Sequence, residues 1–127
     1  MARRSRGITV DISGLRQARG RLEELPEELR GACQRAIADG AEAVKEKTEQ
    51  LVPVDTGHLA RNVRVRRRER GLSADVGWFD KKSYYAAFVE HGTESQSAQP
   101  SLGPALEEER PELPRRIRAE IRRLFGR

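Results

Sequence analysis

The chain has 127 residues, which fits a single domain with one hydrophobic core and excludes two separate catalytic domains. Only 36% of the residues are hydrophobic and 5% aromatic, whereas 35% are charged, so we expect a thin core that partners complete. No apolar run approaches the roughly 20 residues that span a bilayer, and the basic N-terminus leads into no signal-peptide stretch. We therefore expect no membrane attachment, and one domain over residues 1–127 that begins with a basic flexible tail, residues 1–7.

The net charge of +5 invites a nucleic-acid interpretation, but the charges are unevenly distributed along the chain. Residues 61–70 hold six arginines and one acid, whereas residues 23–50 hold eight acids and four bases. Such segregation suits either the binding of a polyanion or the docking of identical copies through surfaces of opposite sign. Net charge alone does not decide between them.

The N-terminal half predicts a short strand followed by two helices. Alternating apolar residues predict a strand over residues 8–12, and Ser13 can cap a short helix over residues 13–25. Pro26 fits the first turn of a second helix, because the first N–H groups of a helix have no partner inside it. The second helix carries one apolar stripe, and it is expected to be long and central. The stripe consists of Cys33, Ile37, Gly40, Val44, Thr48 and Leu51.

Pro53 ends that helix, since proline cannot continue the hydrogen-bond ladder. Residues 54–57 are predicted to form a turn, in which Asp55 or Thr56 caps a short helical turn over residues 57–60. A β-hairpin follows, with strands over residues 62–70 and 72–79 and a turn at Arg70 and Gly71.

The C-terminal part predicts a short apolar segment, a loop and a broken helix. Periodicity does not settle the type of the segment over residues 84–90, and the polar residues 93–100 are expected to form a loop that orders against a partner. Ser101 is the expected cap of a helix that kinks near Arg110, before Pro111. The predicted fold class is α+β, in which a long N-terminal helix and a C-terminal helix pack on a small antiparallel sheet.

The triplet Asp55-Thr56-Gly57 matches the active-site triplet of aspartic proteases, in which two carboxylates share one proton. A long helix and a proline precede the triplet here, whereas the protease triplet lies between apolar strands, so helix termination and capping are the better account. His58 and His91 have no ligand-spaced partner, and Cys33 lies on the apolar stripe. We predict no enzyme activity, no catalytic residues, no metal and no cofactor.

Arginines that face one side of the first hairpin strand form a ladder with two open interpretations. It could bind phosphates, or it could pair with Glu42, Glu46 and Glu49, or with residues 107–109, on a neighbouring copy. The second is favoured, because both charge types are present in one chain and the strand has no aromatic residues for stacking bases. The arginine ladder and its flanking residues are Arg61, Arg64, Arg66, Arg68 and Arg70.

Three segments resemble a known set of motifs in the same order: residues 52–59 (VPVDTGHL), 85–93 (YAAFVEHGT) and 99–106 (QPSLGPAL). Together they resemble the gene-product-ten-like tail-component family of long-tailed, siphovirus-type, double-stranded DNA bacteriophages. The resemblance extends over roughly residues 8 to 125. The prolines at 111 and 114 depart from the uninterrupted final helix of the family.

The resemblance implies a virion protein of the head–tail junction, a neck, tail-completion or tail-terminator component, assembled in the host cytoplasm. Copies would form a ring, first expected as a hexamer with a dodecamer as the alternative. The ring would lie between the head connector or stopper and the tail tube or terminator, with DNA passing through without sequence specificity. The alternative is a basic module that grips DNA by its phosphates.

The resemblance also implies structural roles for two groups of residues. The first fixes the junction of helix and sheet: Pro53, Asp55, Thr56, Gly57 and Leu59. The second shapes the loop after the apolar segment: Tyr85, Glu90, Gly92 and Thr93.

Overall fold

The computed structural model describes residues 8–10, 26–53 and 57–126. The predicted tail over residues 1–7, the predicted helix over residues 13–25, and Asp55 and Thr56 lie outside the described residues. The elements are, in chain order, β1 (Ile8–Val10), α2 (Glu27–Leu51), α3 (Gly57–Arg61), β2 (Arg64–Arg68), η2 (Glu69–Gly71), β3 (Ser73–Gly77), η3 (Lys81–Ser83), α4 (Ala86–His91), α5 (Leu102–Glu109) and α6 (Glu112–Phe125). In the described residues no helix is long and apolar enough to cross a bilayer.

Helix α2 is the long helix that the apolar stripe predicts. Pro26 precedes it, and Glu27 and Glu28 lie in its first turn, where carboxylates meet the positive end of the helix dipole. The helix ends as Val52 turns extended (ψ 135°) ahead of Pro53. The stripe is buried from Cys33 to Thr48, whereas Leu51, which we placed on it, is 39% exposed in the last turn of the helix.

Strands β1, β3 and β2 form an antiparallel sheet in that order. The predicted hairpin is therefore present, with strands shorter than expected. Its connection is the turn η2, in which Glu69, Arg70 and Gly71 all have positive φ. A Cβ at Gly71 would lie 3.3 Å from Cγ of Gln34, so the sheet approaches α2 closely at this turn.

The core lies between one face of α2 and the sheet. Val44 and Ile37 of α2 meet Val76 of β3, and all three are at most 4% exposed. The indole of Trp78 is buried beside them and donates from Nε1 to the carbonyl oxygen of Leu59 (2.9 Å). That bond ties α3 to the end of β3, because a buried indole N–H requires an acceptor.

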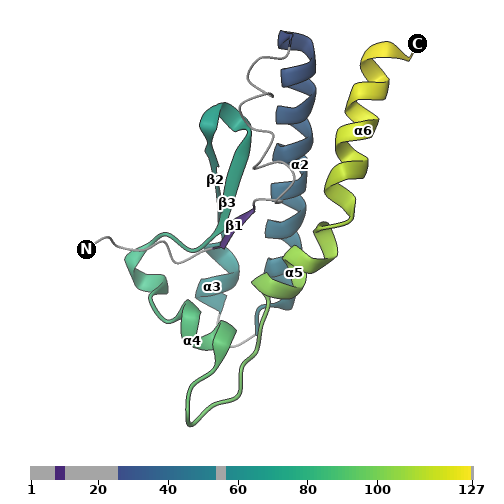
Figure 1. The fold of residues 1–127 in the computed structure, drawn as a ribbon. Coiled ribbons are helices and arrows are strands. Elements are labelled where there is room, and N and C mark those ends of the chain that lie inside the picture. The colour runs from purple at the N-terminus through teal and green to yellow at the C-terminus, as the bar shows by residue number, and fades with distance from the viewer. Residues whose placement is uncertain (1–7, 11–25, 54–56, 127) are drawn as a thin grey trace.

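Helices α5 and α6 return along α2 on the side away from the sheet (Figure 1). They are separate helices that break at Arg110 and Pro111, which confirms the predicted kink. Gly40 lets the layers approach, since a Cβ there would lie 2.8 Å from Oε2 of Glu109 and 3.2 Å from Cδ1 of Leu113. The α+β class is confirmed, with α2 packed between the sheet and the C-terminal helices.

We expect Leu59→Ala to lower the free energy of unfolding by about 2 to 5 kcal/mol, because the side chain is 1% exposed and its removal leaves a cavity beside Trp78. Leu51→Ala is the matched control, and its half-exposed side chain should change the same quantity by less than about 1 kcal/mol. Urea denaturation followed by Trp78 fluorescence measures both. Equal destabilisation of the two variants would contradict the position of the core.

Candidate functional site

The turn after α2 leads into α3, which begins at Gly57. His58 lies within 3.1 Å of Asp80 (Nε2 to Oδ2), and Asn62 donates from Nδ2 to the carbonyl oxygen of His58 (2.7 Å). Ser83 of η3 donates to Oδ1 of Asp80 (2.6 Å), and this bond, with the His58 contact, lowers the pKa of Asp80. His58 therefore joins α3 to η3.

Within the described part of the chain, no three His, Cys, Asp or Glu side chains gather at metal-ligand spacing. The thiol of Cys33 is buried in α2, and burial raises its pKa, which disfavours the nucleophilic thiolate. His91 is exposed at the end of α4. These residues thus offer the described chain no evident catalytic arrangement.

Glu90 of α4 caps the N-terminus of α5. Its Oε1 accepts the backbone N–H groups of Ser101 (2.9 Å) and Leu102 (3.1 Å), and its Oε2 accepts the N–H of Gly103 (2.7 Å). The side chain is buried, and the free N–H groups of a helix start favour a carboxylate. Our prediction that Ser101 caps this helix is wrong, since its side chain makes no capping bond and the cap comes from a residue distant in sequence.

Gly92 and Thr93 turn the chain back after α4. Gly92 has φ 81°, and a Cβ there would lie 2.8 Å from the backbone nitrogen of Ala98. Thr93 exchanges bonds with Gln96, its N–H donating to the carbonyl oxygen (2.9 Å) and its Oγ1 accepting from the N–H (3.1 Å). The half-buried Tyr85 packs against the core at the start of α4. These residues therefore shape the passage from α4 into the exposed loop over residues 93–100.

Of the arginines that we assigned to the ladder and its flanks, Arg64, Arg66 and Arg68 lie on the edge strand β2, and all three make contacts within the chain. Arg64 donates to the carbonyl oxygen of Arg61 (2.9 Å), and the guanidinium of Arg66 lies 4.3 Å from the ring centre of Phe79. Arg68 pairs with the buried Asp75 (2.7 Å). Among the described residues, the side chains of Arg61, Arg67 and Arg70 form no hydrogen bond or ion pair.

Most of the acids that we assigned to the opposite surface also have cations within the chain. Glu49 pairs with Lys45, Glu107 with Arg110, and Glu108 with Lys47. Glu109, which is 6% exposed, binds Arg116 through two bonds of 2.7 and 3.0 Å and raises its pKa. Of the acids predicted to dock, Glu42 and Glu46 form no hydrogen bond or ion pair with any described residue.

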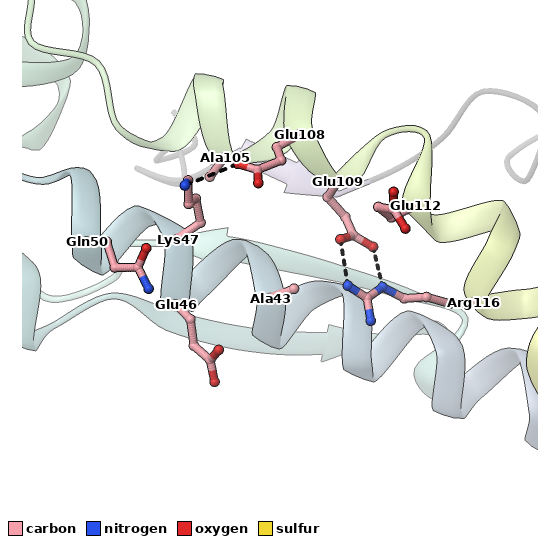
Figure 2. A pocket seen from close by; sticks show the side chains of 9 residues that line it. All are labelled: Ala43, Glu46, Lys47, Gln50, Ala105, Glu108, Glu109, Glu112 and Arg116. Atoms are coloured by element: carbon pink, nitrogen blue, oxygen red, sulfur yellow. Dashed lines mark hydrogen bonds and ion pairs between the residues drawn. The ribbon is translucent and has the colours of Figure 1, made fainter.

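The Lys47–Glu108 and Glu109–Arg116 pairs line a hollow of about 290 Å³ between α2 and the C-terminal helices (Figure 2). The side chain of Glu46 points away from both pairs. The hollow is polar, and most of its charges are paired, whereas Glu46 at its wall has no partner among the described residues. Its walls are Ala43, Glu46, Lys47, Gln50, Ala105, Glu108, Glu109, Glu112 and Arg116. The two pairs therefore join α5 to α2 and to α6, and the hollow is no evident ligand site.

A family model described as "Bacteriophage HK97-gp10, putative tail-component" matches residues 16–92, which is more than half of the chain. The chain therefore belongs to this family of phage tail components. Comparisons with curated proteins and with solved structures gave no match. The matched region contains α2, the hairpin and α4, whereas α5 and α6 lie beyond it. The protein is thus a structural component of a phage virion.

We expect Glu90→Gln to destabilise the protein by about 1 to 3 kcal/mol, because the amide replaces a charged acceptor that serves three backbone N–H groups. Hydrogen exchange should accelerate at the amides of Ser101, Leu102 and Gly103. Glu94→Gln, in the exposed loop, is the control and should change neither quantity. Unchanged exchange at the start of α5 in Glu90→Gln would contradict the cap.

Proposed function

We propose that the protein forms a ring at the head–tail junction of the virion and joins the head connector or stopper to the tail tube or terminator. Two observations taken together support this proposal: the chain belongs to a family of tail components, and its acidic and basic residues lie on separate surfaces. One chain of a tail-component family carries acids on α2 and arginines near β2 and on α6, several of which form no hydrogen bond or ion pair with any described residue. Surfaces of opposite charge suit a ring, because each copy of a ring binds its neighbours through two different patches.

The acidic side of the contact is the open face of α2, which carries Asp39, Glu42 and Glu46. Arginines of β2 and of α6 are available for the basic side. A hexamer is the first expectation and a dodecamer the alternative, with DNA passing through the channel. The buried anchors of the fold, Leu59 and Glu90, hold this geometry and take no part in chemistry.

The ring proposal predicts a closed assembly with a central channel, either from the protein alone or after mixing with the phage's head-connector and tail-tube proteins. Native mass spectrometry gives the copy number, and negative-stain electron microscopy shows the channel. A stable monomer in both settings would contradict the proposal.

The second candidate is a module that binds DNA by its backbone. The side chains of Arg61, Arg67 and Arg70, which have no partner in the described part of the chain, favour it. If it holds, DNA affinity falls steeply with salt, and replacing these three arginines by alanine lowers the salt slope by about 0.9 for each phosphate that the protein no longer neutralises. A filter-binding titration from low to high salt measures the slope. Weak binding with an unchanged slope would favour the ring instead.

A further inference from the structure

The outer face of α6 is a basic stripe that faces away from its own core. Arg115, Arg118 and Arg122 are exposed, whereas Leu113 and Glu120 are buried on the inner face. Arg115 shares an exposed pair with Glu112 (2.8 Å). Arg118 and Arg122 form no hydrogen bond or ion pair with any described residue, so this part of the surface charge is uncompensated.

The open face of α2 is an acidic stripe of the same spacing. Asp39, Glu42 and Glu46 are exposed and form no hydrogen bond or ion pair within the described residues. Arg116 attracts Asp39 and Lys45 attracts Glu42, without contact. Both stripes have their charges at steps of three and then four residues, so each is about 10 Å long at the helical rise of about 1.5 Å per residue.

We propose that the basic stripe of α6 in one copy docks on the acidic stripe of α2 in the next copy. The inference rests on the proposed ring and names the surfaces that close it. The two stripes are separate patches of one copy. The acidic stripe lies on α2 next to the C-terminal helices, since Arg35, four residues before Asp39, pairs with Glu120 of α6. The basic stripe lies on the opposite side of α6 from its buried residues Leu113 and Glu120. The contact therefore joins two different patches, so each copy can bind one neighbour through its basic stripe and another through its acidic stripe.

The occupant is a second copy because the charges and lengths of the two stripes are complementary. The β2 arginines are less suited to this contact, since Arg64, Arg66 and Arg68 are held by a carbonyl, a ring and a carboxylate of their own chain. Neither Arg118 nor Arg122 has such a contact in the described structure. Exposed ion pairs are screened by salt, so a contact of this kind weakens as ionic strength rises.

Charge reversal in the full chain tests the contact. One variant carries Glu42→Arg and Glu46→Arg, and the other carries Arg118→Glu and Arg122→Glu. Each alone should assemble at least about tenfold more weakly than the wild type, because attraction becomes repulsion. An equimolar mixture should recover assembly with an even number of copies, and a chain with all four substitutions should assemble by itself. Native mass spectrometry measures all of these, and thermal melting shows that each variant is folded.

The control variant carries Arg61→Glu and Arg67→Glu, which reverse equally exposed charges near β2 and should leave assembly unchanged. If the control dissociates the ring while both stripe variants assemble, the ring stands and this contact is overturned. The contact is also overturned, and the ring kept, if the variant with Arg118→Glu and Arg122→Glu still forms the ring but no longer binds a DNA duplex that the wild type binds. A wild-type chain that stays monomeric alone and with its connector and tail proteins overturns the ring and the contact together.

Discussion

The structure depends on helix α2 packing on two sides at once. Its inner residues, such as Ile37 and Val44, contact the sheet, and its small residues, Ala36 and Gly40, allow α5 and α6 to lie close on another side. A larger residue at Gly40 would overlap with Glu109 and Leu113. The thin core is sufficient because a single helix supports both layers, and the remaining face of that helix is left to solvent or to a partner.

Buried carboxylates connect the layers where apolar side chains are few. Glu90 holds α4 to the start of α5, Glu109 holds α5 to α6 through Arg116, and Glu120 holds α6 to Arg35 of α2. Each of these carboxylates is at most 9% exposed and has partners, which is the condition under which a buried charge is tolerated. The chain thus uses part of its many charges inside the fold and presents the rest as separate stripes.

This division of charges connects the fold to a role in a virion. A tail component must bind its neighbours in register, and stripes of opposite sign on a rigid pair of helices provide direction and spacing as well as attraction. Exposed pairs are individually weak, so the contact that we propose would gain strength from closure of the assembly more than from any one pair. Salt would weaken it while leaving the buried pairs intact.

Local patterns in the sequence were sufficient for the helix over residues 27–51, the hairpin, the break at Pro111 and the family, because periodicity, proline and short motifs act over a few residues. The cap of α5 was mispredicted, since Glu90 lies far from Ser101 in sequence and only the returning loop brings them together.

The sequence by itself determined the long helix, the hairpin, the break near Pro111 and the segregation of charge along the chain, whereas it left open that residues 86–91 are helical. Only the tertiary structure decided which charges are neutralised: it paired Glu109 with Arg116 and Arg68 with Asp75, and it left Arg118 and Glu46 exposed. The physical reason is that a charge is compensated by its neighbours in space, and helix packing and strand register set those neighbours.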